Sequence, residues 1–161
     1  MAVETKTVKI GLDNWEIASL DDADKVVGTP IKAPGLVSAN MALTVNTGNF
    51  QADDGLWAVL DGGLSAFSLT IGNADIKSKI KEVLHGITLE DGMEIYKSDM
   101  VIPYVATIFR SRLNTGKYVW FGLAKGKFGP GGVDLNTRAD TPTGQPDSVV
   151  GNFEPRADGI T

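Results

Sequence analysis

Residues 104–128 constrain the fold more than any other part of the chain. Two runs rich in β-branched and aromatic residues flank the short polar segment Asn114-Thr115-Gly116. Glycine at the end of this segment suits a backbone position with positive φ. The pattern predicts a long β-hairpin.

The second strand of this hairpin is apolar on both faces. Successive strand residues point to opposite sides of a sheet, so Tyr118 and Trp120 share one face, whereas Val119, Phe121 and Leu123 share the other. A strand with one solvated face would be polar at every second position. We therefore expect one face to pack on the chain's own core and the other to be covered by a helix or by another subunit.

The composition is typical of one folded domain. The 161 residues are 42% hydrophobic and 22% charged, which favours a globular core, and the length predicts a single domain over residues 1–161. The 19 glycines and seven prolines favour many turns and hence β structure. The chain has no cysteine, which excludes disulfides, thiol nucleophiles and thiolate metal sites.

The sequence gives little support for a membrane protein or for a nucleic-acid-binding protein. Charged residues at Glu4, Lys6 and Lys9 interrupt the N-terminal segment, so we expect no signal peptide. Apolar runs stay well short of the roughly 20 residues that a membrane-spanning helix needs. The formal net charge of −5 argues against a general nucleic-acid-binding protein.

Acidic and basic residues are separated along the chain. Acidic residues predominate in residues 1–70, whereas residues 100–127 contain five basic residues and no acidic residue. The five are Arg110, Arg112, Lys117, Lys125 and Lys127. Two interpretations remain open, namely a solvated basic hairpin or a basic surface that meets an acidic surface on a neighbouring copy.

Residues 46–63 are expected to form a loop. Four glycines interrupt this segment, while Phe50 and Trp57 remain large and apolar. Asp53 and Asp54 are adjacent and would point to opposite faces of a strand, which is a poor arrangement for a paired-carboxylate active site. A long loop with exposed aromatic residues is more often an interaction surface.

A single helix is expected shortly after residue 73. Asn73 is a suitable N-cap, and Gly86 is a suitable left-handed residue after the last turn. The core-facing stripe consists of Ile76, Ile80, Val83 and Leu84. Lys77 and Lys81 would face solvent. His85, the only histidine, lies in the last turn, where interaction with the negative end of the helix dipole is favoured over catalysis.

The remaining pattern predicts a mostly antiparallel β domain with one helix packed over it. Further strands are expected over residues 5–10, 15–20, 36–45, 64–71, 93–97, 133–137 and 148–153. The sequence offers no convincing catalytic, cofactor-binding or metal-binding constellation. Residues 122–128 lack the spacing of a phosphate-binding loop, and residues 21–25 begin a segment without the glycine of an EF-hand. We therefore expect binding or assembly, not enzyme activity.

Short motifs occur in a fixed order along nearly the whole chain. They are Gly11-Leu12 leading to Trp15-Glu16-Ile17-Ala18, Gly28-Thr29-Pro30 before Ala33-Pro34-Gly35-Leu36-Val37-Ser38-Ala39, Ala52-Asp53-Asp54-Gly55, Leu84-His85-Gly86, Tyr104-Val105-Ala106 with Phe109-Arg110-Ser111, and Asn114-Thr115-Gly116-Lys117-Tyr118 followed by Lys125-Gly126-Lys127-Phe128. In order and spacing they resemble the tail tube protein (major tail protein) of long non-contractile-tailed bacteriophages, the siphophages, in the group common among phages of Gram-positive hosts. Residues 129–132 are richer in glycine than that pattern, and we expect no extra C-terminal immunoglobulin-like module.

This resemblance implies a structural virion protein of the viral tail. Tail tube proteins are β-sandwiches with a flanking helix, and six copies close into a hexameric ring whose inner strands form a continuous β-barrel. The rings stack head to tail into a hollow tube, which encloses the tape-measure protein and conducts DNA to the host during ejection without binding it specifically. The implied partners also include tail tip and tail terminator proteins, and the implied location is the virion tail, assembled in the host cytoplasm. No membrane, cofactor or metal is implied.

The same resemblance makes two sets of residues candidates for the subunit interface. The acidic and apolar set is Phe50, Asp53, Asp54 and Trp57, and the basic set is Arg110, Arg112 and Lys117. Head-to-tail contacts use two different surfaces of each subunit, so opposite charges on the two surfaces are a sensible arrangement. A net-acidic subunit would also give a lumen that repels the phosphates of DNA.

Two alternatives remain open. Another ring-forming virion part, such as a tail terminator or head decoration protein, would form a single ring or trimer instead of a filament. A carbohydrate-binding β-sandwich would need an aromatic platform on one face, whereas Trp15, Trp57 and Trp120 belong to separate expected elements.

Overall fold

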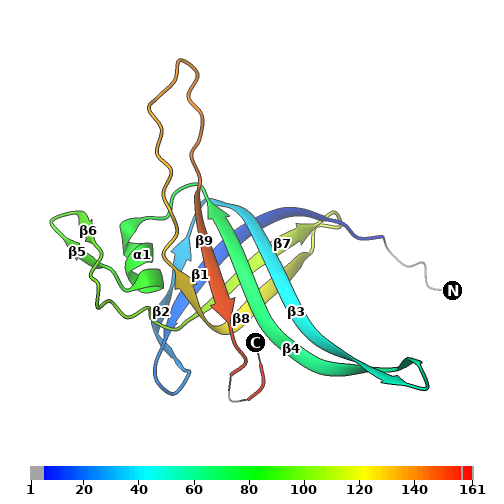
Figure 1. The fold of residues 1–161 in the computed structure, drawn as a ribbon. Coiled ribbons are helices and arrows are strands. Elements are labelled where there is room, and N and C mark those ends of the chain that lie inside the picture. The colour runs from blue at the N-terminus through cyan, green and yellow to red at the C-terminus, as the bar shows by residue number, and fades with distance from the viewer. Residues whose placement is uncertain (1–5, 157, 161) are drawn as a thin grey trace.

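One large antiparallel sheet organises the chain in a computed structural model, which describes residues 6–156 and 158–160 (Figure 1). The order across the sheet is β2-β1-β7-β8-β9-β4-β3. These strands are β1 (Lys9–Leu20), β2 (Val26–Ala33), β3 (Leu36–Ala52), β4 (Gly55–Asn73), β7 (Val105–Leu113), β8 (Tyr118–Gly129) and β9 (Asp147–Phe153). The helix α1 (Ser78–His85) and the small hairpin of β5 (Thr88–Glu90) and β6 (Met93–Ile95) complete the fold. The expectation of a mainly β domain with one helix is therefore confirmed.

The hairpin expected in residues 104–128 is present as β7 and β8. Gly116 has a φ of 83°, as its place in the turn requires, and the N–H of Leu113 donates to the carbonyl oxygen of Lys117 at 2.8 Å. Phe109 and Leu123 are buried on one face, whereas Trp120 on the other face is 49% exposed. The face that the sequence leaves without a cover is thus open in the single chain.

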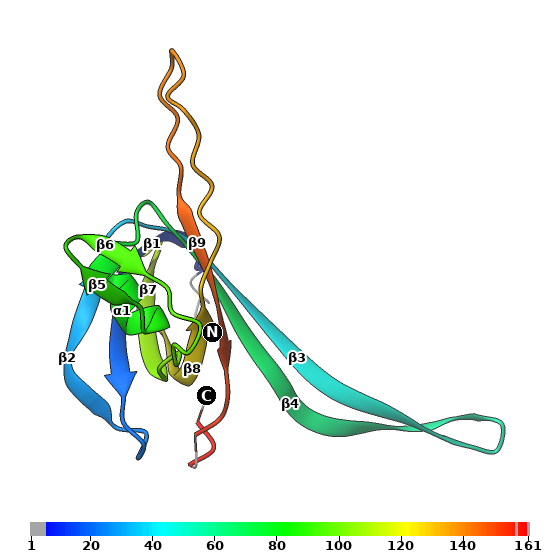
Figure 2. The ribbon, with the colours of Figure 1, turned by 60° about the vertical axis from the view of Figure 1, so that its left-hand side comes forward.

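The core lies inside the curve of the sheet (Figures 1 and 2). Trp15 is 1% exposed and meets the ring of Phe128 edge-on at a centroid distance of 6.4 Å. The indole N–H of Trp15 donates to the hydroxyl of Thr107 at 2.8 Å, so this large side chain is buried without losing its hydrogen bond. Helix α1 packs against β8 and closes part of the core.

Helix α1 begins later than the sequence predicts. Asn73 is not its N-cap but the last residue of β4, where it pairs with Asp147 of β9 and its side-chain oxygen accepts a hydrogen bond from the N–H of Asp75. Sheet pairing therefore outweighs the capping preference, and the helix starts at Ser78. Gly86 has a φ of 68° and ends the helix in the left-handed conformation, as expected.

The predicted core-facing side of α1 and of the turn before it is confirmed. The prediction that the opposite side faces solvent is confirmed only in part. Ile80 and Leu84 are buried, and Ile76 is buried from the turn that precedes the helix. Lys81 does not face bulk solvent as predicted, because its ammonium group lies 3.2 Å from a carboxylate oxygen of Glu94. The β5–β6 hairpin thus covers a helix face that the sequence leaves open.

His85 is a buried residue of the helix end. Its side chain is 2% exposed, and Nδ1 lies 3.1 Å from the carbonyl oxygen of Phe128, to which it donates a hydrogen bond in the neutral ring. Burial lowers the pKa of His85, although the hydrogen bond to Phe128 acts to raise it. The structure therefore favours a neutral hydrogen-bonding histidine over the helix-end cation that the sequence suggests.

One other expectation needs correction. Residues 133–137 are not a strand but belong to a long extended loop between β8 and β9, which rises from the sheet in Figures 1 and 2. In this loop the side chain of Gln145 bonds to both backbone groups of Asn136. Thr5, the expected start of the first strand, and Glu4 lie outside the described residues. No helix in the described ranges is long and apolar enough to cross a membrane.

Candidate assembly surfaces

Residues 46–63 form a projecting arm and not the loop that the sequence predicts. They are the outer half of the β3–β4 hairpin, and Figures 1 and 2 show this ribbon reaching far beyond the other strands. Strand β9 pairs with β4 only between Phe67 and Asn73, so in the described part of the chain the outer half of β4 has β3 as its sole neighbour. We call residues 46–63 the arm.

The tip of the arm is a tight turn of Asp53 and Asp54. Both residues have positive φ, 51° and 59°, and Ala52 pairs directly with Gly55 across them. Two consecutive residues with positive φ are the mark of the two-residue turn whose twist matches a β-hairpin, and aspartate tolerates this conformation. The two carboxylates therefore sit at the very end of the arm.

Glycines bend the arm where it leaves the sheet. Gly63 has a φ of 75°, and its N–H donates to the carboxylate of Asp61 at 2.8 Å. A Cβ at Gly62 would lie 3.0 Å from the carbonyl oxygen of Asn46, which is closer than a side chain tolerates without a shift. The register of β3 and β4 shifts at this place. The glycines thus belong to a β-bulge that redirects a strand.

Large apolar side chains cover the arm although no core lies beneath it. Phe50 is 53% exposed and Trp57 is 67% exposed. Phe50 pairs with Ala58 and Gln51 pairs with Leu56, which leaves Trp57 as the extra residue of a second bulge. Leu56, Val59 and Leu60 are exposed as well. Exposed apolar residues in such a group mark an interaction surface.

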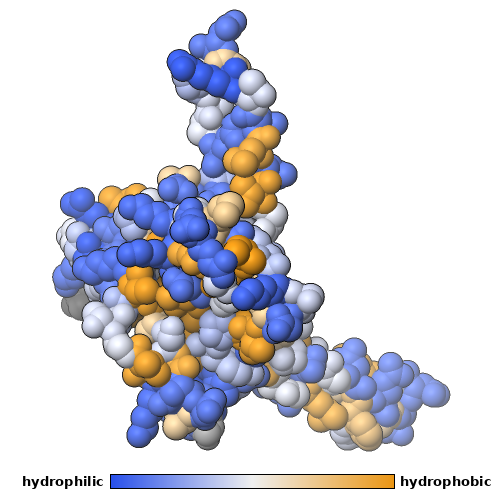
Figure 3. All heavy atoms as spheres, turned by 90° about the vertical axis from the view of Figure 1, so that its left-hand side faces the viewer, coloured by the Kyte–Doolittle hydropathy of each residue, from blue (hydrophilic) through white to orange (hydrophobic). Residues whose placement is uncertain are grey.

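The arm is acidic as well as apolar. It contains Asp53, Asp54 and Asp61 and no basic residue. The candidate residues Phe50, Asp53, Asp54 and Trp57 are therefore brought together on one projecting element. Figure 3 shows hydrophobic and hydrophilic side chains side by side on the arm at its lower right.

Strand β3 is a long edge of the sheet, and in the described part of the chain no further strand lies beside it. It runs for 17 residues, Leu36–Ala52, without a charged residue or a proline. Edge strands usually carry lysine, proline or a covering segment, because free backbone groups otherwise pair with another strand. The opposite edge, β2, carries both Pro30 and Lys32. Of the two edges, β3 is therefore the one open to pairing with another strand along its whole length.

The basic candidates lie on the outer face of the β7–β8 hairpin, opposite the core. Arg110 pairs with Trp120 across the two strands, and Arg112 pairs with Tyr118. Arg112 is exposed on this face, and Lys117 is exposed in the turn that follows β7. The structure brings Arg110 and Arg112 together on β7, and β8 and β9 lie between β7 and the β4–β3 pair that carries the arm of the same chain.

Arg110 already has a partner within the chain. Its Nε and Nη2 atoms both donate to the carboxylate of Asp13, the second at 3.1 Å, and its guanidinium carbon lies 4.1 Å from the centre of the Tyr118 ring. These hydrogen bonds from Arg110 lower the pKa of Asp13. The sequence did not reveal this pair, because the two residues are 97 positions apart.

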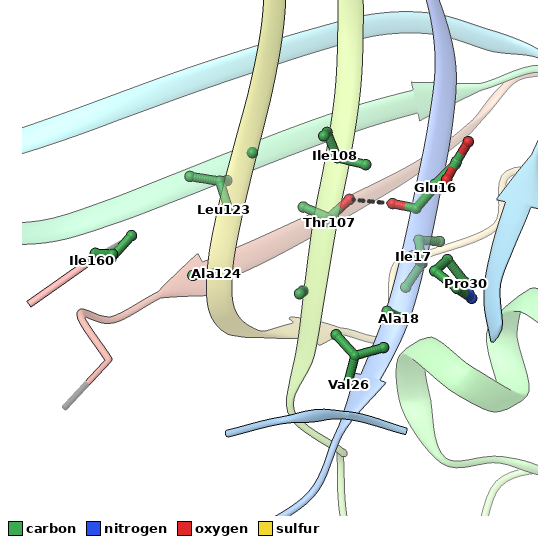
Figure 4. A pocket seen from close by; sticks show the side chains of 12 residues that line it. Glu16, Ile17, Ala18, Val26, Pro30, Thr107, Ile108, Leu123, Ala124 and Ile160 are labelled. Atoms are coloured by element: carbon green, nitrogen blue, oxygen red, sulfur yellow. Dashed lines mark hydrogen bonds between the residues drawn. The ribbon is translucent and has the colours of Figure 1, made fainter. Parts of the chain in front are cut away.

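An apolar groove lies on the same outer face, beside Arg110. It has a volume of about 320 Å³ and is formed by β1, β2, β7 and β8 together with Ile160 (Figure 4). Its floor consists of small residues, namely Ala18, Ala106, Gly122 and Ala124. Val26, Pro30, Ile108 and Ile160 form its walls. Sequence reasoning missed the groove, because its residues come from four strands and from the end of the chain.

The described residues give little support for a metal site or for a sugar-binding site. Among the residues described, no cluster of three or more histidine or acidic side chains could hold a metal ion. Trp15 is buried, Trp57 lies on the arm and Trp120 lies on the outer face, so the three tryptophans do not form a common platform for a sugar.

Comparison with known proteins supplies no family, since no protein-family model matches the chain and no curated protein matches its sequence. Three surfaces of the described chain are candidates for contact with a partner, namely the arm, the β3 edge and the outer face of β7 and β8.

Proposed function

We propose that the protein is the tail tube subunit of a long non-contractile-tailed bacteriophage. In this proposal hexameric rings stack head to tail into a hollow tube. The observation that carries the proposal is the β3 edge, which is 17 residues long, uncharged and free of proline, and which continues into the projecting arm. A monomer that left this edge open would be prone to uncontrolled pairing, whereas a closed ring covers it.

Ring closure would join unlike edges of neighbouring subunits. The β3 edge of one copy would meet residues 26–29 of β2 in the next copy, ahead of Pro30 and Lys32, which oppose strand pairing. Repetition of this contact around six copies would produce a continuous inner β-barrel. A contact between two different surfaces closes into a ring when the rotation between copies divides a full turn. The resulting fold is the β-sandwich or barrel type of tail tube proteins, with α1 packed beside it.

Stacking would use the arm. Its exposed Phe50 and Trp57 and its acidic tip would reach a subunit of the adjacent ring, where Arg112 and Lys117 offer positive charge. Arg110 would contribute only by sharing or exchanging its bond to Asp13. The arm favours a filament over a tail terminator or decoration protein, because a single ring needs no projecting contact of this kind.

The tube would then act as a conduit within the virion. It would enclose the tape-measure protein during assembly in the host cytoplasm and end at the tail tip and tail terminator proteins. A net charge of −5 per subunit supports a lumen through which DNA passes without specific binding. A carbohydrate-binding β-sandwich is a weaker candidate, because the three tryptophans lie apart.

Electron microscopy of the concentrated protein, with light scattering, tests the proposal. Wild-type protein should form hollow tubes of stacked six-fold rings, alone or when seeded with tail tip complexes. Leu43→Lys places a charge on the exposed β3 edge and should abolish rings and tubes, while Met93→Lys, at an equally exposed position on β6, should leave them intact. Discrete rings that never stack would indicate a terminator-like part, and a seeded protein that forms neither would refute the proposal.

A further inference from the structure

We propose that the outer-face groove receives Trp57 from the arm of a second copy of this chain. The inference depends on the proposed self-assembly for its biological setting, but it names a contact that the proposal leaves open. It is carried by the shape of the groove, the exposure of Trp57 and the charges around both.

The groove has the size and surface that an indole ring requires. An engineered apolar cavity of about 150 Å³ binds benzene, so a groove of about 320 Å³ has room for the larger indole. Its floor of alanine and glycine leaves the backbone of β7 and β8 close to the surface. Val26, Pro30 and Ile108 supply apolar walls, and Figure 4 shows them around the hollow.

Trp57 is the arm residue best placed to enter such a groove. It is 67% exposed and occupies the extra position of a β-bulge, and bulges re-aim side chains away from the regular pleat. Tryptophan is also the residue type most enriched among side chains that dominate binding energy. A bulged tryptophan near the end of a ribbon therefore presents a large apolar group to a partner.

The charges around the two surfaces are complementary. The arm carries Asp53, Asp54 and Asp61 without a basic residue, whereas Arg112 follows the groove along β7 on the same face. Arg110 lies between the groove and Arg112 but is already bonded to Asp13.

Glu16, the carboxylate that lines the groove, does not oppose this arrangement strongly. It lies 3.8 Å from the ammonium group of Lys32 and accepts a hydrogen bond from Asn14 at 3.1 Å. An acidic arm is therefore attracted to this face, and the attraction fixes its orientation more than its affinity.

The contact must join two copies. The arm continues β3 and β4 at one side of the sheet, whereas the groove lies over β1, β2, β7 and β8 on the other side. The arm points away from the sheet in both ribbon views (Figures 1 and 2). Because arm and groove are different surfaces, a pair of copies keeps one free arm and one free groove after the first contact, and association continues head to tail.

A mixing experiment tests this contact in isolation from the sheet edge. All proteins carry Leu43→Lys, which blocks edge pairing. Trp57→Ala removes the indole ring that would enter the groove, and Gly122→Val fills the floor of the groove. A Cβ at Gly122 has its nearest neighbour, Ile108, at 3.9 Å, so the fold tolerates the change. Each variant should weaken self-association at least about 30-fold, as expected for a central interface residue.

An equimolar mixture of the two variants gives the decisive result. The Gly122→Val protein keeps its Trp57 and the Trp57→Ala protein keeps its groove, so the mixture should contain heterodimers and no longer chains. Analytical ultracentrifugation and native mass spectrometry measure these species. Met93→Ala and Gly144→Val, which remove and add apolar groups at exposed positions elsewhere, are the matched controls and should associate like the parent.

Several results would overturn the inference. They are a Leu43→Lys parent that stays monomeric up to about 1 mM, a folded Gly122→Val variant that associates like this parent, and a mixture without heterodimers. Failure of the tube proposal is a separate outcome. If both variants formed normal tubes in the wild-type background, the groove contact would be wrong and the tube would stand. If heterodimers formed but seeded wild-type protein gave no tubes, the groove contact would stand and the tube proposal would be wrong.

Discussion

Replacing Thr107 with valine should destabilise the fold by about 2 kcal/mol. The side chain of Thr107 is buried, and its hydroxyl, on β7, makes hydrogen bonds to two groups of the neighbouring strand β1. It accepts a hydrogen bond from the indole N–H of Trp15 at 2.8 Å and donates one to the carbonyl oxygen of Glu16 at 3.1 Å. Valine keeps the branched shape and the strand preference of threonine but loses both bonds.

The magnitude follows from the burial of Trp15. This side chain is 1% exposed, so water cannot replace the lost acceptor, and an unsatisfied buried donor costs about 1–3 kcal/mol. The carbonyl oxygen of Glu16 adds less, because that residue is partly exposed. For a chain of this size, each kcal/mol lowers Tm by about 2–4 °C, so a decrease of about 4–8 °C is expected.

Urea unfolding followed by circular dichroism measures the effect, and Trp15→Phe is the second substitution of a double-mutant cycle. Phenylalanine has no N–H to satisfy, so Thr107→Val should cost at least about 1 kcal/mol less in the Trp15→Phe background than in the wild type. Equal costs in the two backgrounds, or a single variant within about 0.5 kcal/mol of the wild type, would refute the argument that a buried hydrogen bond holds β1 on β7.

Three further predictions concern packing, protonation and the arm. A Cβ at Gly126 would lie 2.4 Å from the ring of Phe153, so Gly126→Ala should lower the free energy of unfolding by about 1–3 kcal/mol in thermal denaturation, whereas Gly132→Ala, with open space around it, should change it by less than about 0.5 kcal/mol. Burial lowers the pKa of His85, so the unfolded chain takes up its proton first as pH falls; stability should decrease below about pH 6.5 in the wild type, and this step should be absent from the pH profile of His85→Gln. Asp54 has a φ of 59°, so Asp54→Gly should slow amide exchange in the arm about threefold, measured by mass spectrometry.

Local patterns in the sequence were enough to predict the β7–β8 hairpin and the buried side of α1. Alternation of apolar residues, a glycine in the turn and a spacing of three to four residues all depend on neighbours within a few positions. Gly116 and Gly86 adopt the left-handed conformations that their positions predict. The grouping of β8 residues into two faces is also confirmed, since Leu123 is buried and Trp120 is exposed, but the sequence did not indicate which face meets the core.

The arm was missed because its glycines predicted a loop, whereas in the structure they belong to a β-bulge and to a hairpin turn. Gly62 and Gly63 sit in a bulge of a continuous strand, and Asp53-Asp54 followed by Gly55 forms a hairpin turn. The signal for this turn was present in the adjacent aspartates before a glycine, but the glycines on either side favoured a loop. Glycine marks unusual backbone geometry, and that geometry occurs in bulges as well as in loops.

Contacts between distant segments explain the remaining errors. Asn73 has the chemistry of a helix cap, but pairing with Asp147 holds it in β4. Lys81 has the position of a solvated residue, but Glu94 of β6 covers it. Arg110 stays a candidate for the subunit interface, and Asp13 of β1 is the partner that it binds within its own chain. None of these partners can be identified before the order of the strands is known.

The unsatisfied surfaces of this chain argue together for assembly from unlike contacts. An isolated two-stranded ribbon is marginally stable in water, yet the arm carries exposed Phe50 and Trp57 far from the core. A two-fold dimer would bury one patch against its own copy and leave other surfaces open. Here the free β3 edge over residues 36–45, the acidic arm and the apolar groove occupy different parts of the molecule, and each suits a surface unlike itself. Repeated head-to-tail contacts would cover all three, and contacts of this kind build rings and filaments.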